Sequence, residues 1–319
     1  MSGETNGQVK GIYAALTSAF FLGLAPVFGK LSISHGMEPL AVAALRTILA
    51  ATLLFLVVLI FNRRYLYIYP AGLLGCFLAG GINGIGSLLY YSALGRINAS
   101  VGQLIYSVYP LFVALWLWLD HQRPSRLTIF RLLLVIPALY LLIGPQPIDL
   151  LGVIMMLASA ALYALHLPIN QRVLYDMPAP TVTLYTLLAM SAVVVPAFFF
   201  TNLGEAVQKL DTPAWGALLG LTLVTFFSRL TLFLGVKHLG GLQTALLGLG
   251  ELLITIVFSH ILLHESLTLI QWCGVAFLVA SLVTVRFEKP ASSSQTSGGW
   301  LGWLRPPGIP NEFPWQPHN

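Results

Sequence analysis

A polar pattern crosses the otherwise apolar stretch 241–262. Thr244, Gly248, Glu251, Thr255 and Ser259 are three or four residues apart, so they share one face of a helix. Glu251 lies about ten residues from either end of the stretch. A carboxyl group is costly in such surroundings unless it is paired, hydrated or protonated. Glu251 is therefore a candidate proton acceptor; a static ion pair or a neutral, hydrogen-bonded acid is the alternative.

Two arginines lie inside other apolar stretches. Arg229 is about eight residues from the end of 213–236 that adjoins the stretch of Glu251. At 1.5 Å per residue the two side chains differ in depth by about 3 Å, which makes Arg229 the natural partner of Glu251. Arg46 lies about seven residues from one end of 39–61. From there a long side chain can reach the surface, and contact with a ligand is the other possibility.

A second polar face lies in 99–119. Gln103, Ser107 and Pro110 follow helical spacing, and Pro110 leaves a carbonyl group without its helical donor, which creates a hinge or an exposed acceptor. Tyrosines and amides in neighbouring stretches suit a pocket with aromatic walls. The candidate binding residues are Asn83, Tyr90, Gln103, Tyr106, Ser107, Pro110, Tyr163, Arg229 and Thr244, with Glu251 and Arg229 as a proton-coupling or ion pair.

Catalytic and cofactor signatures are missing from the sequence. It contains no HExxH, CxxC or GxSxG motif and no paired-cysteine zinc spacing. The segment from Gly23 to Leu31 superficially resembles a phosphate loop, but its glycines are one residue too far apart and Leu31 replaces Ser or Thr. We therefore expect no catalytic residue, no metal and no cofactor.

Composition identifies the solvent. The 319 residues are 57% hydrophobic and 8% charged, against about 25% charged in soluble domains. The mean hydropathy is +0.83. Such a chain cannot cover itself with polar surface, which excludes an ordinary soluble enzyme or nucleic-acid-binding module and indicates a lipid bilayer. The net charge of +5 implies no nucleic-acid partner, since Lys and Arg collect in cytoplasmic loops.

Ten apolar stretches are long enough to cross that bilayer as helices. They cover residues 10–33, 39–61, 70–92, 99–119, 127–144, 149–170, 181–201, 213–236, 241–262 and 268–286. With both termini in the cytoplasm, eleven Lys and Arg fall on the cytoplasmic side and three on the other. This bias follows the positive-inside rule. The sequence thus predicts an all-α integral membrane protein of ten helices with both termini cytoplasmic.

The two halves of the chain echo each other at an offset of 141 or 142 residues. Gly11 falls on Gly152, Ser18-Ala19 on Ser159-Ala160, Pro39 on Pro180, and Arg96 on Lys237. Five helices per copy, an odd number, would insert the copies upside down relative to each other, a design typical of transporters. We predict a cytoplasmic N-terminus at 1–9, repeats at 10–144 and 149–287, and a cytoplasmic Trp- and Pro-rich tail at 288–319. The tail is either disordered or rests its tryptophans at the membrane interface.

Taken together, the pattern resembles the drug/metabolite transporter superfamily, specifically its EamA-type members with two five-helix repeats. The resemblance covers roughly residues 10–287 and rests on Gly23, Lys30, Pro39, Arg46, Ala93-Leu94, Pro110, Glu251 and Glu265 in that order. The chain departs from the family at Leu22, where a Trp is common, at Leu252 in place of a Pro, and at Tyr109 in place of an acid.

The resemblance implies a secondary carrier of the bacterial inner membrane, often an exporter of amino acids or related small metabolites. We hypothesise alternating access, with proton coupling through Glu251. A small-molecule substrate and the bilayer are the expected partners, and the chain is a monomer or a homodimer. Two other functions stay open: an intramembrane enzyme acting on lipid-linked substrates, and a non-transporting membrane scaffold.

Overall fold

The computed structural model describes residues 2–120, 125–143, 149–199, 212–264 and 268–283. All the regular elements in these ranges are helices, as the apolar sequence predicts. They are α1 (Ser2–Ser34), α2 (Pro39–Phe61), the short 3₁₀-helix η1 (Arg63–Leu66), α3 (Pro70–Arg96), α4 (Ala99–Tyr106), α5 (Tyr109–Leu119), α6 (Arg126–Ile143), α7 (Leu150–Asp176), α8 (Ala179–Phe199), α10 (Thr212–Leu239), α11 (Gly241–Gly248), α12 (Gly250–Leu263) and α13 (Leu269–Val283).

Eight spans in the described residues are long and apolar enough to cross a membrane. They match eight of the ten predicted stretches. The other two correspond to α6 and α13, which are helical over 18 and 15 residues. The count of ten crossings and the side on which the termini lie stay predictions. Glu265 and the tail 288–319 lie outside the described residues.

Two of the predicted stretches are broken helices. The stretch 99–119 is interrupted at Ser107 and Val108, between α4 and α5. Pro110 follows this break and has no N–H to donate back to Tyr106, so the helix is interrupted next to the proline, and a hinge at this place stays a prediction. The stretch 241–262 is interrupted at Leu249, between α11 and α12. No proline marks this second break, and it was not predicted.

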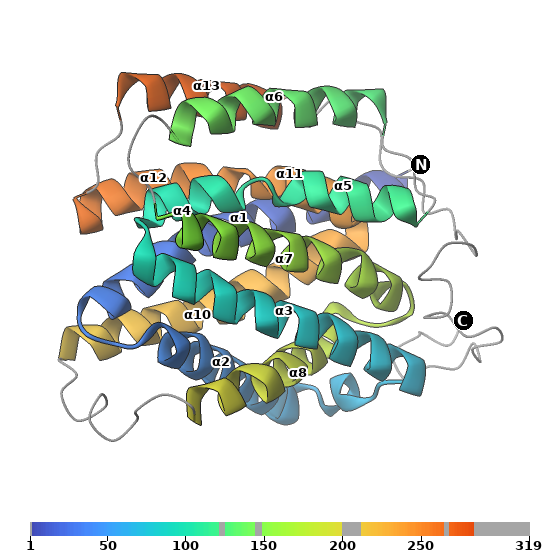
Figure 1. The fold of residues 1–319 in the computed structure, drawn as a ribbon. Helices are drawn as coiled ribbons and strands as arrows, with labels where there is room; N and C mark the ends of the chain where they lie inside the picture. Colours follow the sequence, from blue (N-terminus) through green and yellow to red (C-terminus); the bar gives the residue numbers. More distant parts are fainter. Residues whose placement is uncertain (1, 121–124, 144–148, 200–211, 265–267, 284–319) are drawn as a thin grey trace.

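The breaks and the helix contacts repeat between the halves. Adding 142 to the bounds of α4 gives those of α11. Helix α1 packs on α10 and α12, and its counterpart α7 packs on α3 and α5. Helix α6 packs on its counterpart α13, and α2 packs on its counterpart α8. Figure 1 shows these two pairs at opposite edges of the bundle. These are the contacts of two copies related by an approximate two-fold axis.

One matched pair of hydrogen bonds ties the copies together. The Ser18 hydroxyl of α1 donates to the carbonyl oxygen of Ser228 on α10 at 3.0 Å. The Ser159 hydroxyl of α7 donates to the carbonyl oxygen of Gly86 on α3 at 2.7 Å. Ser18 and Ser159 are the residues whose alignment suggested the duplication, and their two acceptors are 142 residues apart. The sequence echo therefore has a structural counterpart.

Close packing of α3 on α8 depends on Gly80. A Cβ atom at Gly80 would lie 2.5 Å from the Thr186 carbonyl oxygen and 2.6 Å from the Ala189 Cβ. A Cβ atom at the next residue, Gly81, would meet nothing within 4 Å. The two glycines therefore share a helix but differ in the space around them.

We expect Gly80→Ala to lower the melting temperature and Gly81→Ala to leave it unchanged or raise it. Both changes gain about 1 kcal/mol of helix propensity, but overpacking at Gly80 costs roughly 1–3 kcal/mol. Thermal unfolding of the two purified variants in detergent measures the difference. Equal melting temperatures would contradict the tight α3–α8 contact.

Candidate functional site

A cavity lies among helices from both halves of the chain. It leaves about 470 Å³ between protein atoms, including its mouth. The lining residues are Leu22, Ala25, Arg46, Asn83, Gly86, Ser87, Tyr90, Tyr91, Gln103, Tyr106, Ser159, Tyr163, Arg229 and Glu251. They come from α1, α2, α3, α4, α7, α10 and α12, so the cavity lies where the two copies meet.

Arg46 connects the two copies inside this cavity. Its Nη2 donates to the Ser87 hydroxyl at 2.6 Å, and its Nη1 donates to the Thr225 hydroxyl at 3.1 Å. The guanidinium carbon lies 4.7 Å from the centre of the Tyr91 ring. Arg46 is only 5% exposed, so the idea that its side chain reaches the surface is wrong. The distance of a residue from the end of its helix does not show which neighbouring helices cover its side chain.

Arg229 of α10 contacts α3 through the side-chain amide of Asn83. With the amide oxygen of Asn83 facing it, Arg229 donates from Nη1 at 3.3 Å and from Nη2 at 3.2 Å. The same guanidinium lies 5.5 Å from the centre of the Tyr163 ring. Helices α3 and α10 scarcely contact each other. Arg46, Asn83 and Arg229 therefore span a gap between these helices that backbone packing does not close.

Glu251 lies in the first turn of α12, directly after the helix break. It is 2% exposed, and its Oε1 atom has no hydrogen-bond partner among the described residues. Tyr109 and Gln103 are near enough to interact with its carboxyl group, and Arg229 acts on it through space. No Glu251–Arg229 ion pair forms within 4.0 Å in the part of the chain that the structure describes. The N-terminus of α12 favours a negative charge at this place.

Tyrosines form one wall of the cavity. The ring of Tyr106 lies 5.0 Å from that of Tyr90, 5.6 Å from that of Tyr109 and 5.4 Å from that of Tyr163. The Tyr90 hydroxyl donates to the Gln103 amide oxygen at 3.2 Å. An apolar ring surface with a few polar atoms suits a small ligand with an apolar part.

The structure brings most of the predicted site residues together. Asn83, Tyr90, Gln103, Tyr106, Tyr163, Arg229 and Glu251 line the cavity. Ser107, Pro110 and Thr244 do not. The Ser107 and Thr244 hydroxyls donate to carbonyl oxygens one turn earlier in the chain, and Pro110 belongs to the helix break.

Ser87, Ser159 and Thr225 were not among the binding residues predicted from the sequence. The duplication carried the signal: at an offset of 142, Asn83 falls on Thr225 and Ser87 falls on Arg229. A polar pair one turn apart at the same place in both copies indicates a shared surface.

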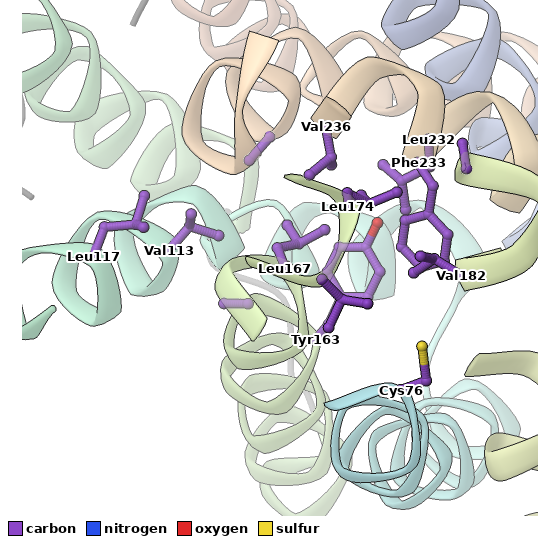
Figure 2. Close-up of a cluster of buried hydrophobic side chains, with 14 of the residues drawn as sticks. Cys76, Val113, Leu117, Tyr163, Leu167, Leu174, Val182, Leu232, Phe233 and Val236 are labelled. Carbon is purple, nitrogen blue, oxygen red and sulfur yellow. The ribbon is translucent and has the colours of Figure 1, made fainter. Parts of the chain in front are cut away.

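Apolar clusters lie on either side of the cavity, toward the two ends of the bundle. Cys76, Val113, Tyr163, Leu167, Leu174, Val182, Leu232, Phe233 and Val236 belong to one cluster and converge from α3, α5, α7, α8 and α10, as Figure 2 shows. The other includes Met37, Val42, Tyr90, Tyr91, Leu94, Ile105, Met156 and Leu218, at the opposite ends of α3, α7 and α10. The polar residues of the cavity thus lie between two apolar layers.

Comparison with known sequences identifies the family. A sequence model of the EamA-like transporter family matches residues 9–144 and again residues 150–287. The chain belongs to the EamA-like transporter family. The resemblance found in the sequence is thereby confirmed, and the chain is a multi-pass membrane protein of a transporter family.

Two curated relatives carry transporter names. The chain is 26% identical over 284 residues to "Uncharacterized transporter YcbK" of Bacillus subtilis strain 168, covering 82% of this chain and 88% of that protein. It is 27% identical over 218 residues to "Uncharacterized transporter sll1319" of Synechocystis, covering 65% and 64%. A solved crystal structure has the same fold, with a TM-score of 0.67, 16% identity and coverage of 88% of this chain and 98% of the other.

Several residues on which the EamA resemblance rests stabilise contacts between helices. The Lys30 ammonium group donates to the carbonyl oxygens of Leu94 at 2.8 Å and Ile97 at 2.9 Å, which caps the end of α3. A Cβ atom at Gly23 would lie 2.4 Å from the Glu251 carbonyl oxygen. Gly23 therefore lets α1 approach the start of α12, where the Thr255 hydroxyl donates to the Gly23 carbonyl oxygen at 2.7 Å.

Two ion pairs lie at opposite ends of α7. Arg172 contacts Asp120, the residue after α5, at 2.6 Å, and the Asp120 side chain is fully buried. Arg96 contacts Asp149, the residue before α7, at 3.2 Å, with both side chains partly in solvent. The Gly152 N–H and then Arg96 hold the pKa of Asp149 below its ordinary value.

We expect Arg172→Gln to destabilise the protein far more than Arg96→Gln. Breaking a buried pair takes the opposite charge away from a buried carboxylate and costs roughly 3–5 kcal/mol, whereas exposed pairs contribute little. Thermal unfolding of both variants, made alike, measures the contrast. A similar loss in the two would show that burial adds nothing to the Arg172–Asp120 pair.

Proposed function

We propose that this transporter exports amino acids or related small metabolites across the bacterial inner membrane by alternating access, with proton coupling through Glu251. The observation that carries the proposal is the polar cavity lined by buried residues of both copies, with an apolar cluster toward each end of the bundle. Inverted repeats with a site at their interface expose it to either side by rocking.

The cavity suits a small, partly polar molecule. Its polar groups are two guanidinium groups, one carboxyl group, two amides and hydroxyl groups, and its remaining wall is aromatic. A mixed lining of this kind both desolvates a ligand and fixes its orientation. Amino acids and similar metabolites combine charged groups with a short side chain in the same way.

In the coupling hypothesis Glu251 carries the proton, because its protonation changes the charge of the cavity. Its carboxyl group is near Arg229, Tyr109 and Gln103. An ionised Glu251 draws the Arg229 guanidinium toward itself, and a protonated Glu251 releases it. Proton binding and substrate binding then act on one shared group, which is the requirement for coupling them.

We expect Glu251→Gln to abolish the pH dependence of transport and to lower its rate. Gln keeps the size and hydrogen-bonding capacity of the side chain but cannot exchange a proton. The assay is uptake of labelled amino acids into everted vesicles or proteoliposomes, with and without an imposed pH gradient. Glu38→Gln is the matched control, since Glu38 precedes α2 and makes no side-chain cap bond there.

The two parts of the proposal fail separately. Unchanged rate and pH response in Glu251→Gln would refute coupling through this residue and leave transport intact. Absence of flux for the whole panel of amino acids and related metabolites, with folded wild-type protein, would refute the proposed substrate range.

A further inference from the structure

The charged groups of the cavity do not balance. Among the residues that the structure describes, Arg46, Arg229 and Glu251 are the charged ones that line the cavity, and each is at most 7% exposed. With Glu251 ionised, two positive charges face one negative charge; with Glu251 protonated, they face none. Buried charge without compensation is costly in a low-dielectric interior. The cavity therefore lacks at least one negative charge.

The two guanidinium groups lie close together. Ser87 and Asn83, which bind Arg46 and Arg229 respectively, are one turn apart on α3. Thr225, which binds Arg46, is one turn from Arg229 itself on α10. One turn of four residues rises about 6 Å. The two positive charges are near enough to act on each other, which is a condition for one small anion to contact both.

Both groups keep donors for such an anion. Arginine has five N–H donors, and the neutral hydroxyl groups of Ser87 and Thr225 use two of those on Arg46. The buried Nε of Arg46 has no hydrogen-bond partner in the described chain. Arg229 directs both terminal nitrogens at one neutral amide oxygen. These partners hold the guanidinium groups in place without cancelling their charge.

We propose that the transported molecule carries a carboxylate that binds between Arg46 and Arg229, with its apolar part against the rings of Tyr90, Tyr106 and Tyr163. This assignment rests on the proposed transport function and names the chemical class of its substrate. A single negative charge brings the cavity to neutrality when Glu251 is ionised, whereas a phosphate dianion does so only when Glu251 is protonated. The planar carboxylate also matches the fork of donors on a guanidinium group.

The test compares ligands that share one apolar group. The acids are L-phenylalanine, 3-phenylpropionate and 4-methylpentanoate; the comparison compounds are phenylalaninamide, 2-phenylethylamine, 4-methylpentanamide and phenyl phosphate. Thermal shift and calorimetry on the full-length protein in detergent measure binding. We expect saturable stabilisation by carboxylates and none by the amides or the amine.

Arginine variants locate the anion. We expect Arg46→Gln and Arg229→Gln to weaken carboxylate binding by roughly 10- to 100-fold, the range for one hydrogen bond to a charged group. Arg46→Lys and Arg229→Lys keep the charge and retain part of the affinity. Arg63→Gln, at an exposed residue of η1, is the matched control and keeps wild-type affinity. The ligand series on the wild type decides the question even where a Gln variant does not fold.

Three outcomes overturn the assignment: amides that bind as well as the acids, binding confined to the amine or to phenyl phosphate, or no binding by any carboxylate. Counterflow in proteoliposomes separates this from the proposed function. Carboxylate binding without counterflow would refute transport and leave the anion site standing. Counterflow of a compound without a carboxylate group would refute the site and leave transport standing.

Discussion

The structure depends on one constraint: charges inside a bilayer must find partners within the protein. Arg46 meets it by binding a hydroxyl group from each copy, Ser87 on α3 and Thr225 on α10. Arg229 meets it through Asn83 across the same gap. Because these bonds cross between α3 and α10, which hardly touch directly, the groups that solvate the charges also hold the two copies at the spacing that leaves a cavity.

The backbone is under the same constraint where the helices break. Pro110 has no N–H, and the Leu249 N–H donates to the Leu246 carbonyl oxygen. A carbonyl oxygen before each break therefore loses its helical donor and cannot turn to lipid. The Tyr109 hydroxyl, just after the first break, donates to the Ala245 carbonyl oxygen at 3.0 Å on the helix before the second break. Both breaks are therefore buried in protein, and one of them places Glu251 at the N-terminus of a half-helix. Polar backbone at mid-depth and a carboxyl group beside it are the features from which carriers build their sites.

Much of this was predictable from the sequence because lipid makes polar residues informative. The helical class, eight of the spans, the duplication and seven of the cavity residues followed from apolar length and polar spacing. The failures have one cause: a single chain does not show which helices face each other. Arg46 was placed by its distance from a helix end, but α3 and α10 bury its side chain. Thr244 was placed by its spacing from Glu251, but its hydroxyl donates to the Gly240 carbonyl oxygen. No proline in the sequence predicts the break at Leu249.

The duplication also explains what differs between the copies. The scaffold is shared: Ser18 and Ser159 make matched bonds, and α4 and α11 have matched bounds. The charges are not shared. At an offset of 142, Ser87 stands opposite Arg229, and Tyr109 stands opposite Glu251. In the proposed alternating access, a scaffold with matched halves allows two conformations of similar energy, since each repacks the same interfaces in exchanged roles. Arg46 in the first copy, and Arg229 and Glu251 in the second, have no charged counterpart in the other copy, so the cavity itself is asymmetric and holds a ligand in one orientation. Under that proposal, symmetric packing serves the movement, and the residues that break the symmetry serve recognition.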